Sequence, residues 1–185
     1  MTGNKNIVQK LLDKYHLMQN DILSYQSNNL AFFKGNISPE LLVVGEAPGP
    51  QEDIIGKPFV GPAGKELDSG LKNQQIDTSK IAFLNVVFRM PLGSNGSFRP
   101  PDDIEIKYYA PLVKELINLL EPSVILACGN VACQSLINQR GIIKLRGRWH
   151  GNILPTYHPS YIVRHPQYRK IFIADINQIK NKLIP

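Results

Sequence analysis

Three short motifs hold the residue types that could do chemistry on a bound ligand. Residues 45–49 read GEAPG, Asn85 lies toward the end of the apolar run IAFLNVV, and residues 156–164 read TYHPSYIVR. Histidine, amide and carboxylate side chains transfer protons, recognise hydrogen-bonding patterns and stabilise charge. Each motif directly follows a stretch that reads as a buried strand. Because the carboxyl ends of parallel strands share one edge of a sheet, we expect the three motifs to meet there and form a ligand site.

The first motif opens a loop, residues 45–64, that is rich in glycine, proline and acidic residues. Gly45 and Gly49 permit the close approach of a ligand or of the chain itself. Pro48 and Pro50 stiffen the turn by fixing φ. This composition indicates a rigid pocket wall at the end of a strand rather than part of a core. The loop also supplies three carboxylates at that position: Glu46, Glu52 and Asp53.

The elements that must position these motifs follow from the apolar pattern. Four buried strands are predicted at residues 40–44, 81–87, 123–127 and 152–156. Helical spacing is found in residues 5–24, 63–71, 102–120, 130–139 and 166–183, and residues 145–150 alternate like a short strand. Strands separated by helix-length segments predict a single-domain, three-layer α/β/α fold over residues 1–185. Its central sheet is expected to be mostly parallel and four-stranded.

The composition limits the classes of function. Lys and Arg total 21 and Asp and Glu total 15, so the formal net charge is +6. This charge permits a polyanionic partner without requiring one. The two cysteines, Cys128 and Cys133, cannot form a disulfide framework or a four-cysteine site. No apolar stretch approaches the ~20 residues of a membrane span, and the start lacks the apolar core of a signal peptide. We therefore expect a cytoplasmic protein with no membrane partner.

Together the motifs resemble those of the family 4 uracil-DNA glycosylases, over about residues 40–165. The resemblance rests on the segments GEAPGPQED, GKPFVGPAG, LNVVFRMP, ILACGNVA and LPTYHPSYIVR, which occur in this order. It implies a hydrolase of base excision repair that flips uracil out of DNA, hydrolyses its N-glycosidic bond and leaves an abasic site. The expected partner is uracil-containing DNA, single- or double-stranded, bound by a monomer.

The resemblance also assigns catalytic roles. His158 would donate a hydrogen bond to uracil O2 as negative charge develops on the departing base. Ala47 stands where the family 1 enzymes carry the aspartate that orients the attacking water. That role would therefore pass to a nearby acid, either Glu46 or Glu52. Either carboxylate could instead exclude the 5-methyl group of thymine.

Four positions would hold the uracil base. Asn85 would read O4 and N3–H, because an amide offers an acceptor and a donor side by side. Phe59 would stack on the flipped ring. Gly45 would allow the base to approach the backbone, and the N–H groups around Ala47 would contact uracil O2.

The segment after the catalytic histidine would contact DNA. Ile162 or Val163 would fill the gap left by the flipped base, as apolar wedges do in proteins that bend DNA, with Tyr161 as an alternative. Ser160 and Arg164 would hold phosphates. A basic run could add phosphate contacts from one face of the short strand: Lys144, Arg146, Arg148 and His150.

The chain departs from its family at the metal site. Typical family 4 members hold a [4Fe–4S] cluster on four cysteines, but residues 1–41 contain none, and the other two ligand positions hold Arg89 and Tyr109. Cys128 and Cys133 read as buried apolar thiols. A cluster needs four suitable ligands, so we predict no cluster and no metal. Arg89 and Tyr109 are expected to replace it by packing and hydrogen bonding.

Two alternatives stay open at this point. The chain could be a non-catalytic DNA-binding or replication-associated protein that kept the fold, or a glycosylase for another base such as hypoxanthine or thymine. Covalent uracil-trapping relatives carry an inserted basic loop with an attacking histidine. Residues 56–68 read GKPFVGPAGKELD with no such insertion, which favours turnover.

Overall fold

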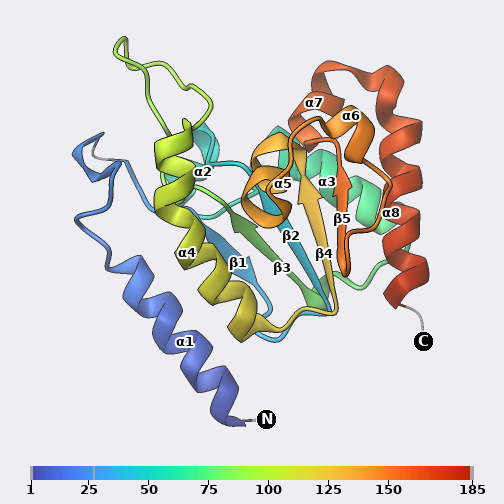
Figure 1. The fold of residues 1–185 in the computed structure, drawn as a ribbon, viewed down its shortest axis with the longest axis horizontal. Coiled ribbons are helices and arrows are strands. Elements are labelled where there is room, and N and C mark those ends of the chain that lie inside the picture. Colours follow the sequence, from blue (N-terminus) through green and yellow to red (C-terminus); the bar gives the residue numbers. More distant parts are fainter. Residues whose placement is uncertain (1, 27, 184–185) are drawn as a thin grey trace.

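A central five-stranded sheet lies between two layers of helices in the computed structural model, which describes residues 2–26 and 28–183 (Figure 1). The strands are β1 (Phe33–Gly35), β2 (Leu41–Gly45), β3 (Ile81–Asn85), β4 (Val124–Cys128) and β5 (Ile153–Thr156). Their order across the sheet is β1-β3-β2-β4-β5. β1 is antiparallel to β3, and all other neighbours are parallel. The three-layer α/β architecture and the mostly parallel sheet are as expected from the sequence.

The strand that the sequence did not predict is β1, so the expected four-stranded sheet is corrected to five strands. β1 pairs with β3 through Phe33↔Leu84 and Gly35↔Ala82. It is three residues long, and only Phe33 among them is buried. A strand of this kind carries no apolar run or alternation long enough to detect in a sequence.

The helices are α1 (Thr2–His16), α2 (Pro50–Ile55), α3 (Pro62–Asn73), α4 (Asp103–Leu120), α5 (Gly129–Ile137), α6 (Ile142–Leu145), α7 (Pro159–Arg164) and α8 (Arg169–Leu183). Short 3-10 turns cover Ser24–Gln26, Thr78–Lys80 and Pro166–Tyr168. Within the described part of the chain, no helix has the length and apolar character needed to cross a membrane.

Three of these helices were not expected, and they are short. α2 and α7 have six residues each and α6 has four, which is too few turns to show a 3.6-residue period. The first helix also ends earlier than predicted, at His16 instead of residue 24. The alternating strand predicted over residues 145–150 is wrong, because α6 and a turn at Gly147, whose φ is 71°, occupy this region.

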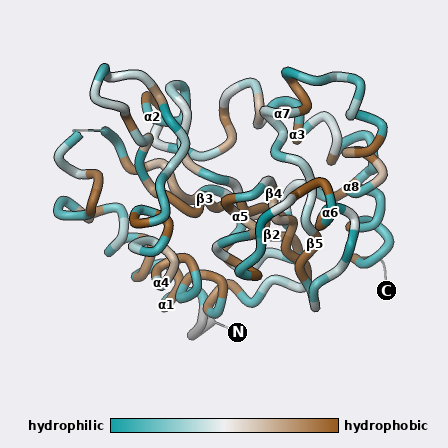
Figure 2. Tube along the Cα trace, turned by 45° about the horizontal axis from the view of Figure 1, so that its top comes forward, coloured by the Kyte–Doolittle hydropathy of each residue, from teal (hydrophilic) through white to brown (hydrophobic). Residues whose placement is uncertain are grey.

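The two faces of the sheet bury separate apolar layers. Leu42 and Val44 pack with side chains of α1, α4 and α5, whereas Leu41 and Val43 pack with those of α3, α7 and α8. Figure 2 shows apolar residues concentrated along the central strands and hydrophilic residues on the outer turns. β2, β3 and β4 are buried along their whole length, as parallel strands covered on both faces usually are.

The register of the sheet brings the ends of the parallel strands together. Gly45 at the end of β2 pairs with Asn85 at the end of β3. Cys128 at the end of β4 pairs with Thr156 at the end of β5. The segments that follow these strands therefore begin at one edge, which positions the three sequence motifs side by side as expected.

Candidate active site

A cavity of about 650 Å³ lies at the carboxyl ends of the parallel strands. Its walls come from the loop after β2, the end of β3, the loop before α4, the start of α5, α6 and the segment after β5. Most of the residues singled out in the sequence line it: Glu46, Ala47, Glu52, Phe59, Asn85, His158, Ser160, Val163 and Arg164. Gly45, Ile162, Arg146 and Arg148 are not among its lining residues.

Gly45 lies behind the cavity wall and sets the spacing of two of its side chains. A Cβ atom at this position would lie 2.5 Å from Cζ of Phe59 and 2.7 Å from Oδ1 of Asn85. Such contacts are too short for any residue larger than glycine. The missing side chain therefore allows Phe59 and Asn85 to approach the end of β2.

Phe59 is held in an unusual backbone conformation. Its φ is +54°, a left-handed conformation that costs a non-glycine residue about 1–3 kcal/mol. The Lys34 ammonium donates to its carbonyl oxygen at 2.8 Å, and a Cβ at Gly64 would lie 2.1 Å from that same oxygen. Phe59 is 5% exposed, and its ring centroid lies 6.4 Å from that of His158 with 27° between the planes. The loop thus fixes a flat apolar surface facing the cavity.

Glu52 secures this loop. Its Oε1 accepts hydrogen bonds from the backbone N–H of Val60 at 2.9 Å and of Gly61 at 2.7 Å. Both donors directly follow Phe59 in the chain. Although Glu52 lines the cavity, this carboxylate oxygen is committed to positioning the aromatic wall.

Glu46 has a different environment. Burial raises the pKa of its carboxyl group above the ordinary value, and the nearby Arg164 guanidinium partly opposes that rise. Within the described residues, the Glu46 carboxylate accepts no hydrogen bond from another side chain or from the backbone, so its oxygens remain available to a water molecule or a ligand. Of the two acids left open by the sequence, Glu46 is therefore the one whose carboxylate is not committed to holding the loop.

Asn85 presents a fixed amide to the cavity. The side chain is almost fully buried, with 3% of the residue exposed. Its Nδ2 donates to the carbonyl oxygen of Ala31 at 3.2 Å, and its backbone N–H donates to that of Phe32 at 2.8 Å. The amide orientation is therefore set from behind. One N–H and the Oδ1 acceptor remain to read a ligand.

His158 is held as a neutral hydrogen-bond donor. It caps α7, and its Nδ1 accepts from the Ser160 backbone N–H at 3.2 Å, with the Ser160 hydroxyl 2.7 Å away. Burial, with a smaller contribution from Arg164, lowers the His158 pKa to about 4. An imidazole that accepts at Nδ1 carries its single proton on Nε2. The free Nε2–H can then donate into the cavity.

Helix α7, which begins directly after His158, places the two candidate wedge residues in different environments. Val163 is 41% exposed and lines the cavity, whereas Ile162 is fully buried in the core layer of α3 and α8. The prediction that Ile162 could contact DNA is wrong, because the helical turn of α7 directs it inward. Tyr161 also lines the cavity, and its ring centroid lies 4.3 Å from that of His165.

The basic run 144–150 does not form one face. Arg146 forms two hydrogen bonds with the buried carboxylate of Asp175, one from Nε to Oδ2 at 2.9 Å and one from a terminal guanidinium nitrogen to Oδ1. Thr156 donates to the same Oδ2 at 2.8 Å. Arg146 therefore supports the end of β5, and this pairing disfavours the phosphate contact predicted for it. Arg148 is exposed but does not line the cavity.

Several cavity residues were missed by sequence reasoning. They come from the loop before α4, from the start of α5 and from α6: Phe98, Pro100, Asn130, Ile142 and Ile143. Of these, only Asn130 lies in a quoted segment, ILACGNVA, and no role was expected of it there. The available signal was the glycine- and proline-rich composition of the loop after β3, which resembles the pocket-forming loop after β2.

The positions of two expected cluster ligands hold a polar network instead. Arg89 Nε lies 2.7 Å from Oδ2 of Asp21, and the Tyr109 hydroxyl donates to Oδ1 of Asp21 at 2.5 Å. Arg89 also donates to the carbonyl oxygens of Met18 and Asn28. All three interacting side chains are buried. Arg89 and Tyr109 thus pack and hydrogen-bond at these positions as expected, with Asp21 as their common partner.

The donor groups of this chain do not fit an iron–sulfur cluster. Such clusters are held mainly by cysteine thiolates, usually four. Cys128 and Cys133 are fully buried, and burial raises the pKa of both thiols, to about 11 for Cys133. The described residues contain no group of three or more His, Cys, Asp or Glu side chains arranged to hold a metal.

Comparison with known proteins identifies the class that this fold and site define. The family model described as the uracil DNA glycosylase superfamily matches residues 32–180. The chain therefore belongs to this superfamily.

Within the superfamily, the chain is similar to individual proteins over most of its length. A type-4 uracil-DNA glycosylase of Thermotoga maritima is 32% identical, over 86% of this chain and 85% of the relative. A type-4 uracil-DNA glycosylase of Sulfurisphaera tokodaii is 29% identical, over 94% of this chain and 86% of the relative. A DNA polymerase of Bacillus phage SP01 is 27% identical over 81% of this chain, but the match covers only 16% of the polymerase.

Proposed function

We propose that this protein is a DNA repair glycosylase that hydrolyses the N-glycosidic bond of uracil in DNA and leaves an abasic site. The observation that carries the proposal is the convergence of Asn85, Glu46 and His158 on one cavity at the sheet edge. The membership of the chain in the uracil-DNA glycosylase superfamily supports the same activity. Because the reacting bond is inaccessible in stacked DNA, the nucleotide must be flipped into the cavity.

Recognition of uracil depends on the Asn85 amide. Its N–H donates to uracil O4 and its Oδ1 accepts from N3–H, a pair that cytosine presents in reverse. Phe59 stacks on the flat face of the base, and the backbone N–H groups around Glu46 and Ala47 lie toward O2. Gly45 contributes by keeping Phe59 and Asn85 close together.

Bond cleavage leaves positive charge on the sugar and negative charge on the departing uracil. The Nε2–H of neutral His158 donates to uracil O2 and stabilises the anion, a type of contact worth about 3–4 kcal/mol. The Glu46 carboxylate faces the opposite charge and orients the water that attacks the sugar. Glu52 serves the same site indirectly, since it holds the loop that carries Phe59.

DNA is held at the rim of the cavity. Val163 fills the space left by the flipped base, because it is the exposed apolar residue of α7. Ser160 and Arg164 contact phosphates beside it, and Arg148 adds a more distant positive charge. The substrate is uracil-containing DNA, single- or double-stranded, and the protein acts as a monomer. Catalysis uses no iron–sulfur cluster.

The activity is tested with purified protein and three oligonucleotides, which carry a U·G pair, a T·G pair or uracil in a single strand. Alkali-labile strand breaks confined to the uracil substrates support the proposal. An inosine substrate tests the alternative specificity for hypoxanthine. Absence of any break at every protein concentration would exclude the proposed activity.

A replication-associated role without catalysis is the second candidate, and the match to part of a phage DNA polymerase favours it. The same oligonucleotides discriminate the two functions. A non-catalytic protein would retain these DNAs in a gel-shift assay but leave each strand intact after alkali. It would also bind uracil-containing and uracil-free DNA with equal affinity.

A further inference from the structure

A hairpin formed by residues 91–99, here called the arm, projects beside the cavity. Gly93 N–H donates to the carbonyl oxygen of Ser97 at 2.8 Å, Leu92 pairs with Phe98 in antiparallel fashion, and Arg99 N–H donates to Pro91 at 3.1 Å. In Figure 1 the arm rises above α4, whereas α7 lies over the other end of the sheet. The arm and α7 therefore line the cavity from two separate parts of the fold.

Phe98 is the aromatic residue of the arm. It is 47% exposed, yet it lines the same cavity as Asn85 and His158. A half-exposed aromatic ring contributes little to a core. Its position beside a polar site indicates contact with a ligand instead.

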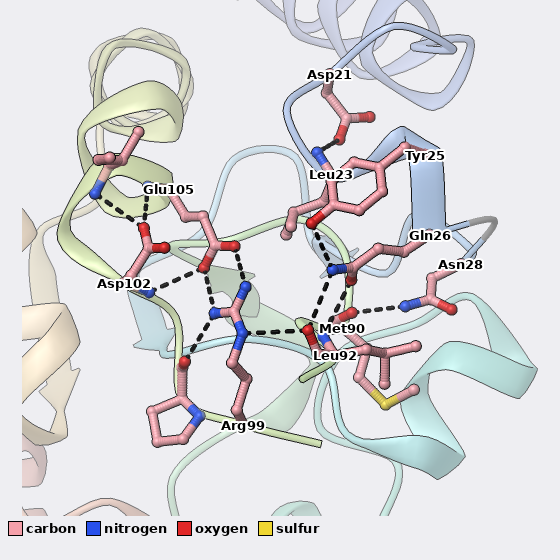
Figure 3. A network of polar contacts seen from close by, with 12 residues as sticks. Asp21, Leu23, Tyr25, Gln26, Asn28, Met90, Leu92, Arg99, Asp102 and Glu105 are labelled. Atoms are coloured by element: carbon pink, nitrogen blue, oxygen red, sulfur yellow. Dashed lines mark hydrogen bonds and ion pairs between the residues drawn. The ribbon is translucent and has the colours of Figure 1, made fainter. Parts of the chain in front are cut away.

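A network of polar contacts fixes the base of the arm (Figure 3), and this gives the neighbouring Phe98 a defined position. The Arg99 guanidinium forms two hydrogen bonds with Glu105, at 2.8 Å and 2.5 Å. Glu105 also accepts from the Asp102 backbone N–H at 2.8 Å and so belongs to the cap of α4. On the other side, Leu92 N–H donates to Gln26 Oε1 at 3.0 Å. This network holds both strands of the hairpin.

The cavity has room for more than one base. Pockets of roughly 300–1,000 Å³ hold drug-sized ligands, and a pyrimidine base is considerably smaller than such a ligand. At about 650 Å³, the cavity can therefore also accept part of a neighbouring nucleotide. The arm, residues 91–99, contains no acidic side chain, so it does not repel phosphates.

We propose that Phe98 stacks on the base of a nucleotide that flanks the flipped uracil, which makes the arm a second DNA-contacting element besides α7. This inference rests on the proposed function, because it takes the cavity occupant to be a nucleotide in DNA. Every base has a π-face, so such a contact tolerates any flanking sequence. Alanine substitution at a base-stacking aromatic typically weakens binding about tenfold.

The test follows the logic of a double-mutant cycle, with one substitution in the protein and one change in the DNA. Wild type and Phe98→Ala are compared on single-stranded uracil oligonucleotides in which the 5′ or the 3′ neighbour is either a normal nucleotide or a tetrahydrofuran residue without a base. Uracil release gives kcat/KM. Kd is measured in parallel on the same oligonucleotides with tetrahydrofuran in place of the uracil nucleotide, so that binding is read without catalysis.

With normal neighbours, Phe98→Ala is expected to lower kcat/KM and raise Kd about tenfold relative to wild type. When the contacted neighbour lacks its base, the variant and wild type are expected to have equal values. Phe98→Trp should retain wild-type values. Ile104→Ala is the matched control, because Ile104 is an exposed apolar residue of α4 outside the cavity. An equal loss with and without the flanking base, or no loss at all, would overturn the inference. If wild type releases no uracil, the proposed function fails, and the Kd cycle still decides the role of Phe98.

Discussion

Asp21 and Arg89 form a buried ion pair, with 2.7 Å between Oδ2 and Nε, that joins the segment after α1 to the chain after β3. The sequence places these residues 68 positions apart. Tyr109 of α4 donates to the other carboxylate oxygen at 2.5 Å, and burial, together with this hydrogen bond, raises the pKa of its phenol. Three segments of the chain therefore meet at one carboxylate, and Arg89 and Tyr109 occupy the two positions at which the family resemblance implies cluster ligands.

Asp21→Asn is expected to lower the free energy of unfolding by about 3–5 kcal/mol, because it leaves the Arg89 charge buried without its partner. Urea denaturation measures the change. Glu40→Gln serves as the control, since the exposed Glu40–Lys80 pair should contribute at most about 1 kcal/mol. A similar small loss in both variants would show that the Asp21 network does not stabilise this region.

Removal of metal should leave the protein unchanged. The purified protein is expected to be colourless, with no stoichiometric iron, and to release uracil at the same rate in excess chelator. The reason is that the neutral, buried thiols of Cys128 and Cys133 are the only cysteine donors in the chain. A brown protein that loses activity with its iron would contradict this expectation.

The depressed pKa of His158 predicts a specific dependence of stability on pH. In the unfolded chain the imidazole titrates near 6.5, and in the folded protein burial lowers that value to about 4. Between these two values the unfolded state binds more protons, so stability falls as the pH drops from about 6.5 to 4. The difference in unfolding free energy between wild type and His158→Gln should shrink over this window. A difference that is independent of pH would show that the histidine is not held neutral.

Much of the architecture follows from the sequence, and the exceptions have physical causes. The apolar runs of β2, β3 and β4 identify strands because these are buried on both faces. β1 escapes detection because its three residues have one buried side chain.

The residues of the candidate site likewise divide into those that the sequence predicts and those that depend on tertiary structure. Asn85 and His158 can be found because Asn85 lies at the end of an apolar strand and His158 closely follows another. The choice between Ile162 and Val163 depends on the turn of a six-residue helix, which no periodicity reveals. The role of Arg146 depends on its ion pair with Asp175, a residue 29 positions away in the sequence. Phe98 belongs to no motif, and its place in the cavity is set by tertiary contacts of the arm.

Substitutions of Glu46 and Glu52 should have different effects on the kinetics of uracil release. Glu46→Gln is expected to reduce kcat about 10²–10³-fold, as loss of an electrostatic catalytic group does, and to abolish the acidic limb of the pH–rate profile. Because burial raises the Glu46 pKa, the wild-type limb should lie above the ordinary carboxyl range.

Glu52→Gln should keep that limb but weaken the loop, since one acceptor of two backbone N–H groups becomes a neutral amide. Its expected signature is a lower melting temperature with a smaller loss of activity. The two assignments would be reversed if Glu52→Gln removed the acidic limb and Glu46→Gln preserved it.

The measurement that tests the central claim most directly is single-turnover release of uracil from a U·G duplex by wild type, His158→Ala and Asn85→Ala. We expect wild type to release uracil but not thymine, and each variant to be slower by about 10²-fold or more, with folding verified by unchanged cooperative unfolding. Wild-type protein that leaves uracil in place, or folded variants that match its rate, would contradict the assignment of this cavity.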